Sequence, residues 1–228
     1  MIFRDKYERS LLPKLFIILA ILASILISMY LMFTESPDII EWLTPYKIKG
    51  NFLRQIIISF CFIIYFFRLL VTSFVFLQRK MYWIEAIIIA SLMPWFLLYI
   101  ARVGGSNDQP FGLIEIIGLI LFMFGSYLNT ASEHTRHTWK QKQENRGHLY
   151  TNGLFKHVRH INYFGDILLF TGFAAVGNSF VLLFIPASMA LIFVLILIPL
   201  KEKYLKNKYG PEFDKYVKRT NKIIPMLY

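Results

Sequence analysis

Long apolar runs separated by short polar intervals organise this sequence of 228 residues. A helix needs about 20 apolar residues to cross the hydrocarbon core of a bilayer. The predicted spans cover residues 15–33, 55–77, 82–101, 111–130, 164–176 and 178–199. The last two are joined by the tight turn Val176-Gly177-Asn178, so they form a helical hairpin. The pattern predicts an all-α integral membrane bundle of about six transmembrane helices.

The longest polar interval ends in a charged stretch, residues 151–166, that leads directly into an apolar run. Charged groups near hydrocarbon are costly unless they pair, meet water or hold a ligand, so this stretch is a candidate site. If it is helical, Arg159, Asn162 and Asp166 share one face. For Lys156 alone, a side chain that reaches from the membrane edge into water is the preferred interpretation.

A second polar face lies just upstream, within residues 128–140. Asn129, Glu133, Arg136 and Lys140 recur at i, i+4, i+7 and i+11, which places an amide, an acid and two cations along one side of a helix. This face could bind a phosphate. Alternatively, it is a solvated helix surface with an ordinary i,i+3 pair between Glu133 and Arg136. The spacing alone leaves both interpretations open.

Charge and composition agree with a membrane protein, since 56% of the residues are hydrophobic and the net charge is +11. The basic residues lie beside apolar spans, which favours anionic lipid headgroups and a phosphorylated cofactor over nucleic acid as partners. With both termini on one side, twenty Lys and Arg residues face that side and four face the other. Because cytoplasmic connections hold the excess of Lys and Arg, both termini and both polar stretches are expected in the cytoplasm.

Cysteine and histidine predict neither a disulfide framework nor a metal site. The single cysteine, Cys61, lies in an apolar run. The histidines lie in the polar interval, where His134 with His137 and His157 with His160 have a spacing that two ligands of one metal can use. No Cys or carboxylate signature accompanies them, and the neighbouring cations repel a divalent ion while they attract a phosphate.

Two motifs in the second half of the chain resemble a known superfamily. The run GLFKHVRHINYFGD at residues 153–166 is similar to the GLFxYVRHxNYxGE/D signature of integral-membrane steroid 5-alpha-reductases and sterol double-bond reductases. NTASE, at residues 129–133, resembles the reductases' Asn-x-x-Ser-Asp. The superfamily also includes isoprenylcysteine carboxyl methyltransferases and bacterial membrane proteins, and the resemblance covers about residues 125–228.

The resemblance implies one transmembrane domain, residues 1–228, in a bacterial inner membrane. Residues 1–110 would form the substrate side, and residues 111–228 would form the cofactor-binding half with a cytoplasmic loop and a C-terminal tail. The implied cofactor is NADPH. Its expected contacts are Asn129, Glu133, Asn162 and Asp166 for the nicotinamide half, Arg136, Lys140 and Arg159 for the phosphates, and His160, Tyr163 and Tyr204 from the signature and the tail.

A tyrosine in the second span is the expected catalytic residue. Tyr65 and Arg68 resemble the reductases' His-Tyr-x-His-Arg, whose Tyr is the proposed proton donor to the substrate carbonyl, although both histidines are replaced here. Tyr65 as a packing aromatic is an equal alternative. Glu41 is the nearest equivalent of the Glu that the reductases pair with this Tyr; Glu85 and Glu115 are other carboxylates at or inside a span, and the sequence does not rank the three.

The choice of reaction depends on where the chain departs from each group. Methyltransferases of the superfamily favour Arg-His-Pro and a Glu-Glu pair after the last helix, where this chain has Ile161 for the Pro and Lys201-Glu202 for the pair. Reductases favour an Asn before the Tyr, as at Asn162. The expected function is therefore hydride transfer from NADPH to a carbon–carbon double bond of a lipophilic, steroid-like or isoprenoid substrate. The alternative is an S-adenosylmethionine-dependent lipid or isoprenylcysteine carboxyl methyltransferase that uses the same pocket.

Overall fold

The computed structural model describes residues 10–34 and 50–224 of the chain, and their regular structure is helical. The α-helices are α1 (Leu11–Phe33), α2 (Phe52–Val71), α3 (Trp83–Gly105), α4 (Leu113–Gln141), α5 (Ile161–Val176), α6 (Phe184–Ile192), α7 (Ile198–Tyr209) and α8 (Pro211–Lys218). Short 3-10 turns are η3 (Gln143–Asn145), η4 (Gly153–Lys156) and η5 (Phe180–Leu183). Two π-helical turns extend or join the long helices: η2 (Thr72–Phe76) continues α2, and η6 (Phe193–Leu197) connects α6 to α7. The predicted all-α membrane bundle is confirmed.

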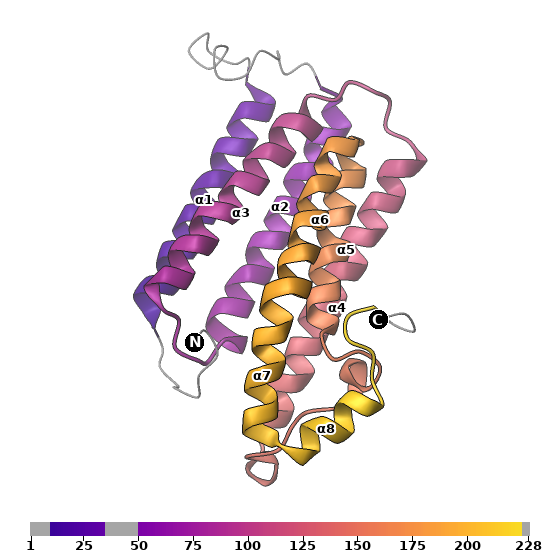
Figure 1. The fold of residues 1–228 in the computed structure, drawn as a ribbon. Helices are drawn as coiled ribbons and strands as arrows, with labels where there is room; N and C mark the ends of the chain where they lie inside the picture. The colour runs from indigo at the N-terminus through magenta and orange to yellow at the C-terminus, as the bar shows by residue number, and fades with distance from the viewer. Residues whose placement is uncertain (1–9, 35–49, 225–228) are drawn as a thin grey trace.

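Five helical segments are long and apolar enough to cross a membrane: Leu11–Phe33, Phe52–Phe76, Trp83–Gly105, Leu113–Gln141 and Phe180–Tyr209. Helix α5 has 16 residues, about 24 Å at 1.5 Å per residue, yet it also runs through the bundle beside α4 (Figure 1). The described chain therefore traverses the bundle six times, as an integral membrane protein.

The helices alternate in direction, so two ends of the bundle can be distinguished (Figure 1). Ser10, the connection of residues 142–160 and helix α8 lie at one end, which we call the site end. The connection of residues 106–112 and the turn at residues 177–179 lie at the other, which we call the far end. In that turn Asn178 adopts a left-handed conformation with φ of 47°. This turn confirms the hairpin predicted from Val176-Gly177-Asn178.

One predicted relation is wrong, because α5 begins only at Ile161. Arg159 therefore precedes the helix and does not share a helical face with Asn162 and Asp166. The backbone before α5 is instead an irregular turn that pairs with the C-terminal tail through an isolated bridge between Val158 and Asn221. The backbone N–H of Arg159 donates to the carbonyl of Asn221 at 3.0 Å, and that of His160 donates to the carbonyl of Lys222 at 3.1 Å.

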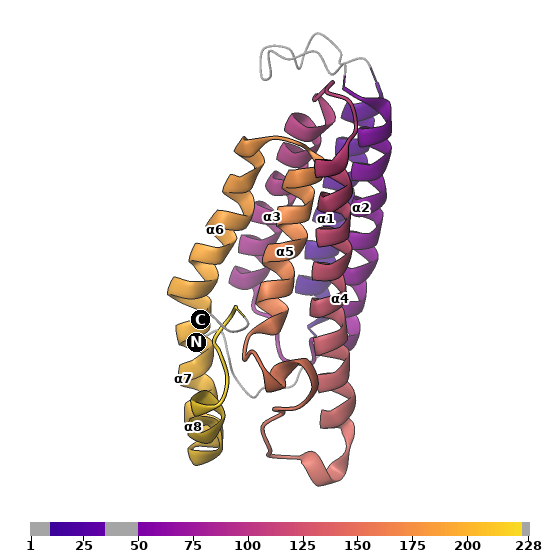
Figure 2. The same ribbon diagram turned by 90° about the vertical axis from the view of Figure 1, so that its right-hand side faces the viewer.

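Glycines bring α4 and α5 into backbone contact. Gly118 and Gly125 on α4 are seven residues apart, as are Gly165 and Gly172 on α5, so each pair lies on one helix face. A Cβ atom added at Gly125 would come within 2.5 Å of the carbonyl oxygen of Gly165, and one added at Gly172 within 2.4 Å of the backbone nitrogen of Phe122. Small residues permit such close approach between membrane helices, and Figure 2 shows α4 and α5 side by side along their length.

At the far end, the fully buried guanidinium of Arg54 joins several elements. It donates to the carbonyl oxygens of Val176 at 3.1 Å, Asn107 at 2.6 Å and Gln109 at 3.0 Å, and to Glu115 Oε1 at 2.5 Å. The second oxygen of Glu115 accepts from the backbone N–H of Gly112 at 2.8 Å. The buried charges of Arg54 and Glu115 are thus paired and hydrogen-bonded, as burial requires.

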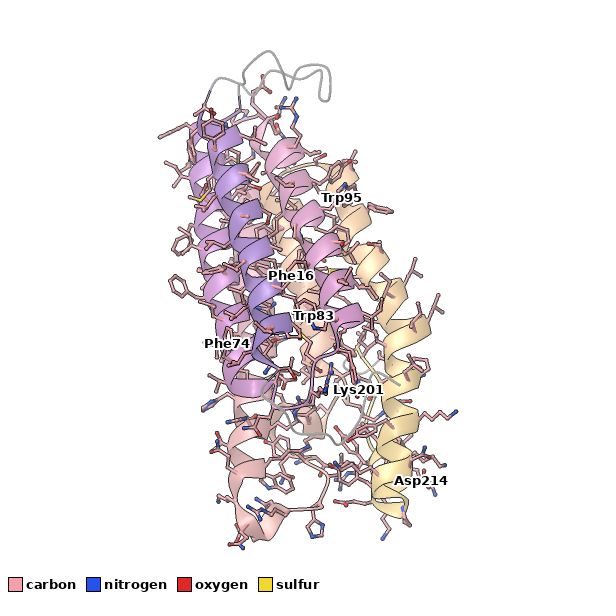
Figure 3. All side chains as sticks on the ribbon, turned by 90° about the vertical axis from the view of Figure 1, so that its left-hand side faces the viewer. Phe16, Phe74, Trp83, Trp95, Lys201 and Asp214 are labelled. Carbon is pink, nitrogen blue, oxygen red and sulfur yellow. The ribbon has the colours of Figure 1, made fainter. Side chains whose placement is uncertain are left out.

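Apolar side chains cover the outside of the bundle. Figure 3 shows Phe16, Trp83 and Trp95 on α1 and α3 and Phe74 on η2, and all four are at least 41% exposed. Nitrogen and oxygen atoms are concentrated toward the site end in the same view. An apolar belt next to a polar end is the pattern expected of a helix bundle that faces lipid.

Candidate functional site

A cavity of about 730 Å³ opens at the site end. Its walls are the end of α2 with η2, the second half of α4, the start of α5, and α7. Figure 2 shows α7 and α8 on one side and the lower part of α4 on the other. The lining residues are Thr72, Phe76, Leu77, Gln78, Arg79, Glu133, Arg136, His137, Lys140, Gln141, Asn145, Arg146, Gly147, His148, Asn162, Tyr163, Lys201, Tyr204, Leu205, Lys208 and Tyr209. The volume lies within the roughly 300–1,000 Å³ of typical ligand and cofactor sites.

The charge of the cavity wall is strongly one-sided. Among the described residues that line it, six are Lys or Arg and one is a carboxylate: Arg79, Arg136, Lys140, Arg146, Lys201 and Lys208 against Glu133. A concave site lined by one sign of charge concentrates ligands of the opposite sign. Guanidinium and ammonium groups form strong charge-assisted hydrogen bonds with phosphate. The cavity is therefore suited to a ligand with several phosphate charges.

The α4 and α5 walls are joined by a short network of amides and an acid. The Asn129 side-chain amide donates to the carbonyl of Asn162 at 3.0 Å, and the Asn162 side-chain amide donates to Glu133 Oε1 at 3.0 Å. The other oxygen of Glu133 accepts from Arg136. Asn162 Oδ1 is buried and lacks a hydrogen-bond partner among the described residues, as does Asn129 Oδ1. Asn162 lines the cavity, so this unpaired oxygen belongs to a residue of the cavity wall.

The polar line predicted on α4 is present as one helix face. Glu133, Arg136 and Lys140 line the cavity, and Asn129 continues the line into the bundle, where it is 6% exposed. The ion pair between Glu133 and Arg136 is also present. The Glu133–Arg136 pair therefore forms as in the second interpretation, and it lies on the wall of a cavity, where the first interpretation expects a ligand.

Helix α7 supplies the opposite wall through residues of one helical face. Lys201, Tyr204, Leu205 and Lys208 follow the spacing i, i+3, i+4 and i+7. The Lys201 ammonium lies 4.6 Å from the centre of the Tyr163 ring, a cation–π contact that crosses from α7 to α5. Figure 3 shows Lys201 toward the site end of the bundle.

Both π-helical turns adjoin this cavity. Thr72 and Phe76 of η2 line it directly. Phe193 of η6 stacks on Tyr163 with the ring centres 4.6 Å apart. A π-helical turn inserts a residue into a helix, and such turns are frequent at functional sites. The position of η2 on one wall and of η6 against Tyr163 therefore agrees with a ligand site here.

Besides Asn129, three residues expected at the cofactor are not on the cavity wall. Arg159 is 8% exposed and its side chain binds Glu202 and the tail, with the Nη1 atom 2.5 Å from the carbonyl oxygen of Thr220. His160 is fully buried and its Nε2 lies 3.2 Å from Glu202 Oε1. Burial lowers the pKa of His160 to about 4 although the hydrogen bond to Glu202 raises it, so the ring is neutral at pH 7. Asp166 is the third.

Asp166 belongs to a polar group inside the bundle. It pairs with Arg68 of α2 at 2.9 Å, with side chains 20% and 10% exposed respectively. Arg68, a charged residue in the middle of a span, thus has its partner inside the bundle. The guanidinium lies 5.5 Å from the ring centre of Tyr65, and Tyr65 is 3% exposed and packs edge-on against Phe170. Tyr65 lies seven residues before Thr72 on a continuous helix, about 10 Å deeper than the cavity wall.

The three candidate carboxylates fall in different places. Glu41 lies outside the described residues. Glu115 is part of the Arg54 network at the far end, away from the cavity. Glu85 pairs with Arg79, which lines the cavity. Of the two candidates that the structure describes, Glu85 is therefore the one linked to the site end.

The structure adds four cations that the sequence did not assign to the site: Arg79, Arg146, Lys201 and Lys208. For Lys201 and Lys208 a signal was available, since both share one helical face with Tyr204. Arg79 and Arg146 lie in connections between helices, where no periodicity exists to reveal which way a side chain points.

Fold and site together define a membrane-embedded helix bundle with a basic, cofactor-sized cavity at one end. Residues 70–220 match the model of a family described as a protein of unknown function, DUF1295. Because the match covers more than half of the chain, the protein belongs to this family, a steroid 5-alpha-reductase-like group. A search of curated proteins finds no match. Every residue that lines the cavity falls within the matched range, whereas Tyr65 and Arg68 lie before it.

Proposed function

We propose that this protein is a membrane reductase that transfers a hydride from NADPH to a carbon–carbon double bond of a lipophilic substrate. The observation that carries the proposal is the ratio of six cations to one carboxylate around the cavity. NADPH carries a pyrophosphate and a 2′-phosphate, so it complements such a wall. S-adenosylmethionine has no phosphate and bears a sulfonium cation, which the same wall would repel.

The residues present fit the two ends of NADPH. Arg136, Lys140 and Lys208 are the groups for its phosphates, since they lie on the two facing walls, α4 and α7. The free Oδ1 of Asn162 and the carboxylate of Glu133 are acceptors for the amide N–H groups of the nicotinamide carboxamide. When bound, NADPH supplies the hydride. In this proposal the phosphates lie toward water and the nicotinamide lies toward the bundle.

The polar group of Tyr65, Arg68 and Asp166 lies deeper in the bundle, where a lipophilic substrate would bind. The Tyr65 hydroxyl would donate a hydrogen bond to the carbonyl of an enone, which draws electron density from the double bond and favours attack by hydride. Arg68, held by Asp166 and placed over the Tyr65 ring, would keep positive charge beside that hydroxyl. The excess of Lys and Arg at the site end favours a cytoplasmic location for the cavity and both termini, in a bacterial inner membrane whose anionic headgroups meet the same basic residues.

The test compares thermal unfolding of the purified protein in detergent with NADPH, NADH and S-adenosylmethionine. A ligand that binds only the folded state stabilises it by RT ln(1 + [L]/Kd), about 2.7 kcal/mol at a hundredfold excess over Kd. We expect the largest rise in melting temperature with NADPH and a smaller one with NADH, which lacks the 2′-phosphate. A rise with S-adenosylmethionine and none with either nicotinamide would replace the reductase by the methyltransferase.

A further inference from the structure

Glu202 lies on α7 beside the cavity but does not line it. The residues before and after it on the cavity face, Lys201 and Tyr204, point to the ligand space, whereas the Glu202 carboxylate faces the segment that precedes α5. Its Oε1 atom accepts from Arg159 Nε at 2.9 Å and lies 3.2 Å from His160 Nε2. A single oxygen of the partly exposed Glu202 carboxylate therefore connects α7 to the segment just before α5.

Arg159 extends this connection to the tail. Its Nη1 atom donates to the carbonyl oxygens of Thr220 at 2.5 Å and Val217 at 3.3 Å. The tail backbone also pairs with the segment before α5, where the N–H of Asn221 donates to the carbonyl of His157 at 3.1 Å. The tail follows α7 and α8 in the chain. Glu202 on α7, the segment before α5 and the tail are therefore connected to one another.

His160 links Glu202 to the cavity wall. Its ring is fully buried and stacks on the ring of Tyr163, with the centres 5.6 Å apart and the planes 9° from parallel. Tyr163 in turn lines the cavity and carries the Lys201 ammonium over its ring. A change at Glu202 therefore reaches both facing walls: α7 through the backbone and α5 through His160 and Tyr163.

We propose that Glu202 is a positioning residue that holds the α7 wall, with Lys201 and Tyr204, at a fixed distance from the α5 wall, with Asn162 and Tyr163. This inference deepens the proposed function and rests on it for the identity of the ligand. Supporting residues of this kind orient the groups that touch a ligand, and their loss in metal sites typically costs 10- to 100-fold in affinity. The expected effect of Glu202→Gln is thus a rise of about tenfold in the Kd for NADPH.

The experiment measures two properties of Glu202→Gln well below its melting temperature, so that unfolded protein does not contribute. The first is hydrogen exchange without ligand: the amides of Arg159, His160 and Asn221 should exchange faster than in the wild type, whereas those of α1 and α3 should not change. The second is the Kd for NADPH. Asp214→Asn is the matched control, because it removes the same charge from an exposed pair with Lys206, whose atoms are 3.1 Å apart; Figure 3 shows Asp214 on α8.

The two measurements separate the inference from the proposed function. A wild-type protein that does not bind NADPH overturns the reductase, and the exchange pattern then decides alone whether Glu202 holds the two walls. A wild type that binds NADPH, with a variant whose Kd is unchanged, overturns the inference even if the variant melts earlier. Faster exchange confined to residues 157–163 and 217–222, together with a raised Kd and an unaffected control, supports it.

Discussion

At the scale of single residues, the basic line on α4 makes the sharpest claim about binding. If Arg136 and Lys140 hold phosphates, Arg136→Ala and Lys140→Ala should each weaken NADPH binding by about 1.5–3 kcal/mol, the range for a hydrogen bond to a charged group. Titration of NADPH into the purified variants measures this loss. A residue that meets the 2′-phosphate should lose less affinity for NADH than for NADPH.

Lys142→Ala is the control for this pair of variants. Lys142 follows Lys140 closely in sequence, but its side chain is 63% exposed, contacts Glu144 at 3.9 Å and does not line the cavity. Its removal lowers the net charge equally and should leave the Kd unchanged. Equal weakening in all three variants would indicate a general effect of charge and remove Arg136 and Lys140 from the site.

His160 gives the folded protein a dependence on pH. Its pKa is about 4 in the folded state, chiefly because the ring is buried, against about 6.5 in an unfolded chain. Between these values the unfolded state binds the proton, so the contribution of His160 to the free energy of unfolding is complete above about pH 6.5 and is lost as the pH falls toward 4. The loss is roughly 1 kcal/mol per pH unit.

The comparison of wild type with His160→Gln isolates this contribution, because every other titrating group is common to both. The groups around the ring are Glu202, Arg159, Lys201 and Tyr163. Melting temperatures between pH 7 and pH 5 should fall more steeply for the wild type than for the variant. Parallel curves would mean that His160 takes up its proton without cost in the folded state.

At the scale of helices, the contact between α4 and α5 decides where the site residues meet. Gly172→Ala would place a methyl group 2.4 Å from the Phe122 backbone nitrogen and 2.6 Å from the Gly118 carbonyl oxygen, so the helices must separate. Overpacking of this kind typically costs about 1–3 kcal/mol. The melting temperature in detergent should fall accordingly. Gly112→Ala is the control, since its new Cβ would have its nearest neighbour at 3.7 Å, an ordinary contact, and should melt like the wild type.

The sequence predicted these helices better than it predicted their contacts. Apolar length and the polar spacing of Glu133, Arg136 and Lys140 are local properties, so they gave the spans and the correct face of α4. The register between α4 and α5 depends on glycines, whose seven-residue spacing was present in the sequence but was not read as a packing signal. Arg159 was misplaced because its partners, Thr220 and Glu202, lie more than 40 residues away in the chain.

At the scale of the whole molecule, the cavity combines elements from about three fifths of the chain, from Thr72 to Tyr209. Its charge was predictable in sign, because Lys and Arg gather next to the spans on one side, but the participation of Arg79 and Arg146 depends on how two connections fold over the bundle end. The depth of Tyr65 and Arg68 was predictable from their place within the second span. Their pairing with Asp166 rather than with the cofactor site required the packing of α2 against α5.

Because of the Arg54 network, the two ends of the bundle differ in the free energy needed to open them locally. Guanidinium, carboxylate and backbone carbonyls bind α2, α4, the last residue of α5 and the connection of residues 106–112 in one buried hydrogen-bond network. Breaking this network would leave an unpaired charge away from water, so local opening of the far end costs much free energy. At the site end, α7 is joined to the segment before α5 by the partly exposed Glu202 and by stacked rings, so we expect local opening there to cost less free energy than at the far end. The hydrogen-exchange rates measured for Glu202→Gln therefore report on the site end and on the far end of the bundle in the same experiment.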